Sequence, residues 1–171
     1  MKYISLVLLA LCIIQIKSDK AAQVVAFAKS KLGCGYVWSA EGQVLNQQNM
    51  KKFHQQYPNN VDMNIVKKWI GKEVYDCSGF VMKALQKVGI KIFHNCEIAW
   101  KSKIWASTGT IKTYPKNKVC IVYRYNGGKM VHTGISLGNG EFIHAKGSKY
   151  GVVQEKMPGS WTHWGIPKGL Y

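Results

Sequence analysis

The hydrophobic periodicity of this chain changes partway along it, and the change limits the folds that it can adopt. Residues 21–32 carry apolar side chains at helical spacing, and Gly33 is placed to end that helix. From residue 119 onward the pattern alternates instead, and turns at 127–128 and 139–140 separate the apolar runs. The predicted strands are residues 119–125, 130–137, 141–145, 152–155 and 164–166. Helices followed by an antiparallel meander predict an α+β fold.

The first 18 residues have the composition of a secretory signal peptide. Lys2 gives a short positive start, residues 4–16 form an apolar run, and Ser18 is a small residue suited to a cleavage point. The run is too short for a comfortable transmembrane helix, which needs about 20 apolar residues. We therefore expect a secreted protein with one domain over residues 19–171 and no stable membrane insertion once the leader is removed.

Residues 42–72 differ from the rest of the chain in composition. They are polar and rich in Asn, Gln and Lys, with weak helical patterns at 47–56 and 61–70 that the segment 58–60 separates. This composition predicts an exposed insertion that packs on the domain and does not contribute to the core.

The formal net charge of +16 favours anionic partners. Specific nucleic-acid recognition is disfavoured, because Arg124 is the only arginine and guanidinium groups are the commonest specific readers of guanine. For a secreted protein, an anionic cell surface or cell-wall polymer is the better partner. The alternative is that the lysines serve solubility alone.

Residues 76–80, Asp-Cys-Ser-Gly-Phe, place a cysteine at the start of a helix predicted to run to about Lys87. Asp76 is a preferred N-cap type, so Cys77 falls in the first turn, where free N–H groups and the helix dipole favour an anion. Such a position can lower the pKa of a thiol and favour the nucleophilic thiolate. The alternative is an inert core cysteine, so a functional reading needs partners elsewhere in the chain.

Two histidines in the predicted meander, His132 and His144, are candidate partners. A two-residue turn at 139–140 would put them on opposite faces of the hairpin. A three-residue loop with Gly140 in the left-handed conformation pairs His144 with Gly134 and puts both histidines on one face. A shared site therefore requires the bulged turn. Cys77 could then act as nucleophile, His132 as its base and His144 as the group that orients His132.

The remaining histidines and cysteines have weaker readings. His54 and His94 lie in polar contexts that predict surface positions, and His163 is expected to pack near the carboxyl terminus. A zinc site is an alternative use of Cys77 and the two histidines, but the usual zinc motifs are missing from the sequence. The pairing of Cys34, Cys96 and Cys120 stays open.

These segments together resemble the NlpC family of cell-wall cysteine peptidases. The shared motifs are Asp-Cys-Ser-Gly-Phe at 76–80, His-Thr-Gly-Ile at 132–135 and Ile-His-Ala at 143–145, in that order. The resemblance spans roughly residues 21–167. It implies a papain-like α+β fold, with N-terminal helices packed on an antiparallel sheet, and hydrolysis of peptidoglycan stem peptides without a cofactor or metal.

The resemblance also implies roles for individual residues. Cys77, His132 and His144 would form the catalytic set, and Tyr36 would help to stabilise the oxyanion. Asp76 and Ser78 match positions that hold the free amino end of the stem peptide, although Asp76 has an N-cap role in any case. Family members usually cut between D-γ-glutamyl and diaminopimelate or lysine.

The sequence departs from the family pattern at several places. Ser39-Ala40 replaces Gly-Gly, Asn117-Lys118-Val119 replaces Gly-Asp-Leu, and the 42–72 insertion lengthens the link to the nucleophile. Two alternatives to the endopeptidase therefore remain. One is a papain-like amidase that cuts between muramic acid and L-alanine, and the other is a non-catalytic cationic protein that binds the cell wall.

Overall fold

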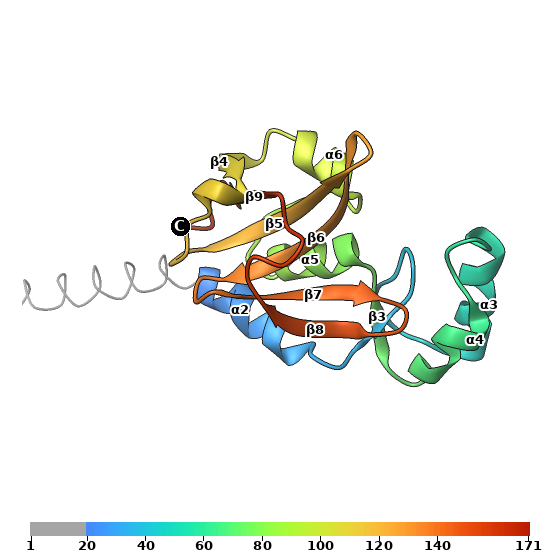
Figure 1. Ribbon diagram of the computed structural model, residues 1–171. Coiled ribbons are helices and arrows are strands. Elements are labelled where there is room, and N and C mark those ends of the chain that lie inside the picture. The colour runs from blue at the N-terminus through green and yellow to red at the C-terminus, as the bar shows by residue number, and fades with distance from the viewer. Residues whose placement is uncertain (1–19) are drawn as a thin grey trace, which may run out of the picture.

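A six-stranded antiparallel sheet forms the centre of the molecule (Figure 1). The computed structural model describes residues 20–171, so the predicted leader lies outside the described residues. The strands are ordered β4-β9-β5-β6-β7-β8, and each neighbouring pair is antiparallel. Their bounds are β4 (Trp105–Thr110), β5 (Val119–Asn126), β6 (Lys129–Leu137), β7 (Glu141–Gly147), β8 (Gly151–Lys156) and β9 (His163–Pro167). The predicted meander is confirmed over β5 to β8, and β9 returns to lie between β4 and β5.

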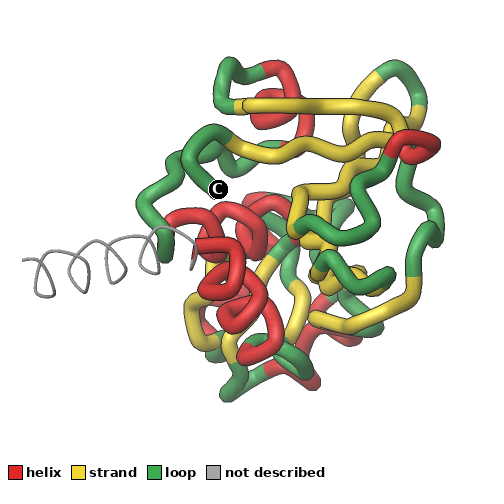
Figure 2. Tube along the Cα trace, turned by 90° about the vertical axis from the view of Figure 1, so that its left-hand side faces the viewer, coloured by secondary structure: helices red, strands yellow, loops and turns green. Residues whose placement is uncertain are grey.

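Two helices, α2 (Lys20–Ser30) and α5 (Cys77–Gln86), pack together beside this sheet. Their apolar faces share one hydrophobic cluster with β5, β6 and β7, and Phe80 of α5 is fully buried in it. Figure 2 shows this arrangement from a second direction, with helices in red and strands in yellow. The α+β class is therefore confirmed. The short helix α6 (Cys96–Lys101) and the 3-10 turn η2 (Ile111–Thr113) complete this part.

Residues 42–72 are mostly exposed, as their composition predicts, but the expectation that they contribute no core is wrong. They build a second hydrophobic cluster in which Leu45, Val61 and Val66 are fully buried. The prediction was wrong because a few apolar side chains, such as Met50 and Phe53 one helical turn apart, provide a buried face within a polar sequence. Figure 1 shows the helices of this segment at one end of the molecule. They are α3 (Gln47–Gln56), α4 (Met63–Val66) and the 3-10 turn η1 (Lys67–Trp69).

A small sheet, ordered β1-β3-β2, connects this second cluster to the rest of the fold. Its strands are β1 (Gly35–Tyr36), β2 (Glu41–Val44) and β3 (Glu73–Tyr75). Trp69 also donates its indole N–H to the carbonyl oxygen of Ser148 over 2.8 Å and so ties the insertion to the β7–β8 hairpin. Within residues 20–171, no helix has the length and apolar character needed to cross a bilayer.

The β6–β7 hairpin has the bulged register that a shared histidine site requires. Ile135 pairs with Ile143 and Ser136 with Phe142, and Gly140 has φ +85°. This register extends to place Gly134 beside His144, where a β-carbon on residue 134 would come within 3.0 Å of the histidine β-carbon. The hairpin prediction is confirmed, and the local reason is that glycine adopts the positive φ that the turn needs.

Candidate active site

Cys77 is the first residue of α5, and its side chain is buried at the point where β3 passes into the helix. Asp76 is the N-cap and accepts a hydrogen bond from the backbone N–H of Gly79 over 2.6 Å. Ser78 donates its hydroxyl hydrogen to the same carboxylate over 3.0 Å. The N-cap thus holds the first turn in place, and the backbone N–H groups of that turn have no partner within the helix.

The structure brings His132 and His144 together with Cys77. His132, on β6, lies beside the thiol and acts to lower the pKa of Cys77. The Nε2 atom of His132 lies 2.8 Å from Nδ1 of His144, on β7, and both rings are buried. The three residues that the sequence proposes as nucleophile, base and orienting group therefore form one continuous chain of contacts.

The chain continues to a fourth residue, Glu155 on β8. His144 Nε2 lies 2.9 Å from Glu155 Oε2, and the other carboxylate oxygen of Glu155 accepts a hydrogen bond from Lys146 over 2.7 Å. The sequence analysis missed this residue. The β7–β8 register of the folded protein supplies it, because Phe142 pairs with Glu155 and Glu155 therefore lies on the same face as His144.

Glu155 determines which ring nitrogens carry hydrogen. An ionised carboxylate only accepts, so His144 must donate from Nε2, and its Nδ1 is then an acceptor. His132 therefore donates from Nε2 to His144, which leaves its Nδ1 as the acceptor for the Cys77 thiol proton. The pKa of Glu155 is lowered, first by the hydrogen bond from Lys146, so it is ionised as this arrangement requires.

Trp161 covers the two histidines. Its ring is parallel to that of His132, with centroids 5.4 Å apart, and it meets His144 edge to face at 5.5 Å. Burial lowers the pKa of His144, although the hydrogen bond to Glu155 opposes this effect. The indole thus keeps water away from a hydrogen-bonded chain whose electrostatic contacts are stronger in a drier environment.

Cys96 modifies the chemistry that the sequence predicts for Cys77. The two sulfur atoms lie 3.7 Å apart, and both side chains are buried. The hydrogen bond shared with Cys96 and burial raise the pKa of Cys77, while the neighbouring His132 lowers it. The expectation of a lowered pKa is therefore wrong for the unliganded protein, because a helix start was considered without the neighbour that α6 supplies.

His94 is also part of the site, contrary to its predicted surface position. Its Nε2 lies 2.9 Å from Asp76 Oδ1, and its Nδ1 lies 3.2 Å from Glu41 Oε1. The hydrogen bond to Asp76 raises the pKa of His94. Asp76 Oδ2 accepts one further hydrogen bond, from the N–H of Ser39 over 2.9 Å. The acidic N-cap is thus held by contacts from two other parts of the chain, in addition to those within its own helix turn.

The other predicted positions are also accounted for. Tyr36 is buried on β1 and belongs to the same hydrophobic cluster as Cys77. Its burial, together with the nearby Cys77, raises the pKa of its phenol. The phenol is therefore neutral and can donate a hydrogen bond. His54 is half-buried and makes a 2.7 Å contact with the carbonyl oxygen of Val61. His163 packs edge to face against Trp100, as expected.

Two cavities flank the candidate catalytic residues. The nucleophile-side cavity, of about 390 Å³, is lined by Cys77, Asp76, Ser78, Glu97 and Lys129, among others. The histidine-side cavity, of about 500 Å³, is lined by His132, His144 and Trp161 and by the cations Arg124, Lys146 and Lys156. A substrate that reaches both Cys77 and His132 therefore meets acidic groups on one side and basic groups on the other.

The cysteines and potential metal ligands are described for residues 20–171 only. Cys34, Cys77, Cys96 and Cys120 are all free thiols there. No three side chains of the His, Cys, Asp and Glu types gather in that part of the chain as a metal site would need.

Comparisons with known proteins agree with this geometry. A search of curated protein sequences found no significant match. Among solved structures, the chain is similar to the NlpC/p60 domain of the peptidoglycan hydrolase SagA, with TM-score 0.57 and 19% identity over 85% of this chain and 97% of that domain. It is also similar to the P60 domain of antigen MAP1204 from M. avium subspecies paratuberculosis, with TM-score 0.59 and 16% identity over 89% and 96%.

A third similar structure is the peptidoglycan hydrolase RipB from Mycobacterium tuberculosis, with TM-score 0.60 and 20% identity over 88% of this chain and 65% of that one. At these identities the similarity establishes the fold. The family is established by sequence, because the model of the NlpC/P60 family matches residues 36–165 and thus most of the chain. The chain therefore belongs to the NlpC/P60 family.

Proposed function

We propose that this protein is a secreted cysteine endopeptidase that cuts peptidoglycan stem peptides between D-γ-glutamyl and diaminopimelate or lysine. The observation that carries the proposal is the continuous chain from Cys77 through His132 and His144 to Glu155, at the start of a helix and between two cavities. Structurally similar proteins that are described as peptidoglycan hydrolases, SagA and RipB, support the choice of substrate.

The arrangement can perform covalent acyl transfer. His132 Nδ1 takes the thiol proton as the sulfur of Cys77 attacks the amide carbon, which gives a tetrahedral oxyanion. The free N–H groups at the start of α5 and the neutral phenol of Tyr36 are the donors available to that oxyanion. His132 then gives the proton to the leaving amine, and a thioacyl enzyme remains.

Hydrolysis completes the cycle. His132 takes a proton from a water molecule as its oxygen attacks the thioester, and the proton returns to the sulfur as the carboxylic acid leaves. Because the resting thiol has a raised pKa, the proton transfer to His132 accompanies attack on the substrate and does not precede it. Asp76 and Ser78 lie beside Cys77 and are suited to contact the acyl half of the substrate, with Asp76 Oδ2 the less occupied oxygen.

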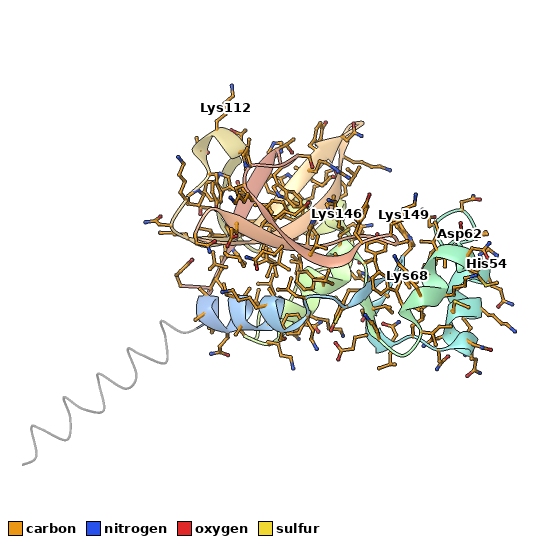
Figure 3. The ribbon with its side chains drawn as sticks, turned by 60° about the horizontal axis from the view of Figure 1, so that its bottom comes forward. His54, Asp62, Lys68, Lys112, Lys146 and Lys149 are labelled. Carbon is orange, nitrogen blue, oxygen red and sulfur yellow. The ribbon has the colours of Figure 1, made fainter. Side chains whose placement is uncertain are left out.

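The positive surface supports a cell-wall target. Figure 3 shows Lys68, Lys146 and Lys149 close to one another, and Lys68 donates to the carbonyl oxygen of Lys149 over 2.6 Å, whereas Lys112 projects from a distant part of the molecule. Such a group of cations would concentrate the protein on anionic wall polymers and would lose this effect as salt is raised. Wall binding that does not weaken with salt would contradict this part of the proposal.

Digestion of purified peptidoglycan tests the proposed reaction. The parent protein and Cys77→Ala are compared, and the fragments are identified by mass. A new amine on the third stem residue is expected from the parent and not from the variant. A new amine on L-alanine would instead identify an amidase, and equal wall lysis by both proteins would identify a non-catalytic binder. Sequencing the amino terminus of the exported protein tests cleavage after Ser18.

A further inference from the structure

The histidine-side cavity has a charge that the proposed reaction does not explain. Three cations line it, Arg124, Lys146 and Lys156, against one carboxylate, Glu155. Both oxygens of Glu155 are occupied, one by His144 and the other by Lys146. Within residues 20–171, neither Arg124 nor Lys156 lies within 4.0 Å of a carboxylate oxygen. Arg124 and Lys156 thus make no salt bridge in the described chain, and of the two only Lys156 has a carboxylate residue, Glu141, as its cross-strand neighbour.

Arg124 is fixed beside the proposed base by the sheet register. It lies opposite His132 in the β5–β6 pair, so the two side chains share one face of the sheet. Its guanidinium is exposed, and its only polar side-chain contact is with Ser160 Oγ at 3.5 Å, at the limit of a hydrogen bond. The fork of the only arginine in the sequence is therefore free to bind an oxyanion with two parallel hydrogen bonds.

The proposed reaction places the leaving half of the substrate in the histidine-side cavity. The acyl half is bonded to the sulfur of Cys77, which lines the other cavity. His132 must contact the leaving nitrogen in order to protonate it, and His132 lines the cavity that contains Arg124. The residue that carries the leaving nitrogen, the third residue of the stem peptide, therefore extends from His132 toward Arg124.

We propose that the histidine-side cavity binds a carboxylate on the side chain of the third stem residue, with Arg124 as the specificity-determining residue and Lys156 in support. The inference rests on the proposed function and deepens it, because it selects between the two third residues. Diaminopimelate carries a carboxylate at the end of its side chain beside an ammonium group, whereas lysine carries the ammonium alone. Arg124 and Lys156 attract the first side chain and repel the second.

Paired substrates test this selection. The tetrapeptides L-Ala-γ-D-Glu-diaminopimelyl-D-Ala and L-Ala-γ-D-Glu-L-Lys-D-Ala differ only in the third residue. We expect the parent protein to cleave the first with a kcat/KM higher by roughly 10-fold or more, the size of a charge-assisted contact. Arg124→Gln should lose this preference, because kcat/KM should fall for the diaminopimelate substrate and not for the lysine substrate. Arg124→Lys should keep part of the preference.

Lys112→Gln is the matched control, because it removes one positive charge from η2, far from the cavity (Figure 3). It should leave the preference unchanged. Equal rates for the two substrates in the parent, or equal losses on both in Arg124→Gln, would overturn the proposal. Circular dichroism of each variant checks that an exposed substitution has not altered the fold.

A binding measurement separates failure of this inference from failure of the proposed reaction. The dipeptides diaminopimelyl-D-Ala and L-Lys-D-Ala, which match the leaving half, are titrated into Cys77→Ala protein by calorimetry. Tighter binding of the first, lost in Cys77→Ala/Arg124→Gln, supports the carboxylate site even if the parent cleaves neither tetrapeptide. Equal or undetectable binding of both dipeptides would overturn the site, whatever the parent cleaves.

Discussion

His144 donates a hydrogen bond from Nε2 to Glu155 over 2.9 Å, and this contact sets the direction of every hydrogen bond from β8 to the nucleophile. The carboxylate cannot donate, so it holds His144 in the tautomer that accepts from His132. His132 is then left with a free Nδ1 beside the thiol. Glu155 is thus a positioning residue that acts through two histidines and does not touch the reacting atoms.

Glu155→Gln should slow the reaction without weakening substrate binding. The amide can offer an N–H to His144 and so favour the opposite tautomer, in which His132 presents a hydrogen to the thiol and no longer a lone pair. We expect kcat to fall by about 10-fold or more, part of the 10²–10⁴ that general acid–base catalysis contributes, with KM nearly unchanged. Steady-state kinetics over a range of pH measure both values.

Lys146→Gln is the control for that change. It removes the other partner of Glu155 but keeps the carboxylate, so the tautomers should be retained and kcat should fall much less. A kcat for Glu155→Gln equal to that of Lys146→Gln would show that Glu155 does not position the histidines.

Cys96→Ala should make Cys77 more acidic. The hydrogen bond that Cys77 shares with Cys96 is the largest cause of the raised pKa of Cys77, so its removal should lower that pKa. More thiolate is then present at a given pH, and the alkylation of Cys77 by iodoacetamide should shift to lower pH. Mass spectrometry of the peptide that contains Cys77 gives the rate of alkylation at each pH.

Cys34→Ala provides the comparison, because Cys34 is a half-buried thiol whose own neighbours are Glu73, Lys31 and Lys72. In the Cys34→Ala variant, the rate of Cys77 alkylation should depend on pH in the same way as in the parent. An unchanged profile in Cys96→Ala would mean that Cys96 does not control the acidity of the nucleophile.

His94 should make stability depend on pH in a definite direction. Its pKa is raised in the folded protein, mainly by the hydrogen bond to Asp76, so its contribution is fully present below its ordinary pKa of 6.5. That contribution is lost as the pH rises through the higher folded value. We expect the parent to lose on the order of 1 kcal/mol of unfolding free energy across this window. Urea unfolding at pH 5.5 and at pH 8.5 measures the change.

His94→Gln should remove this part of the pH dependence, since glutamine can bond to Asp76 but does not titrate. His54→Gln is a useful control, because His54 contacts a backbone carbonyl and no carboxylate. His54→Gln should keep the pH dependence of the unfolding free energy seen in the parent. If His94→Gln kept it too, the His94–Asp76 pair would make no pH-dependent contribution to stability.

Gly79→Ala should distort the start of α5. A β-carbon on residue 79 would collide with the backbone carbonyl oxygen of Ala40, which also accepts a hydrogen bond from the N–H of Asp76 over 2.8 Å. Because backbone cannot give way as a flexible side chain does, we expect a loss of about 1–3 kcal/mol in unfolding free energy and a loss of activity. Gln86→Ala, at the exposed end of the same helix, should change neither. Thermal unfolding and peptidoglycan digestion measure the two effects.

Much of the fold and part of the site were predictable from local sequence. The helix start at Asp76 follows from an N-cap residue before a helical pattern, and it is observed. For the β6–β7 hairpin the sequence left two registers possible, and the one observed is the bulged register that a shared histidine site requires, with Gly140 left-handed. The helix at 47–56 was predicted at its observed bounds, but the second core that it helps to build was not, since its apolar residues are few and only their packing partners reveal them.

The sequence by itself determined the order of the three motifs and the placement of Cys77 at a helix start, and Gly140 permitted the turn that puts His132 and His144 on a common face. These are short-range properties, set by caps, turns and the two-residue period of a strand. Only the tertiary structure decided that Cys96, His94, Glu155 and Arg124 surround them. Each of these four contacts joins separate elements of the fold, and no local pattern specifies which distant side chain will fill the space beside a reactive group. The reactivity of Cys77 is therefore set by neighbours that the folded chain supplies, and not by its helix position alone.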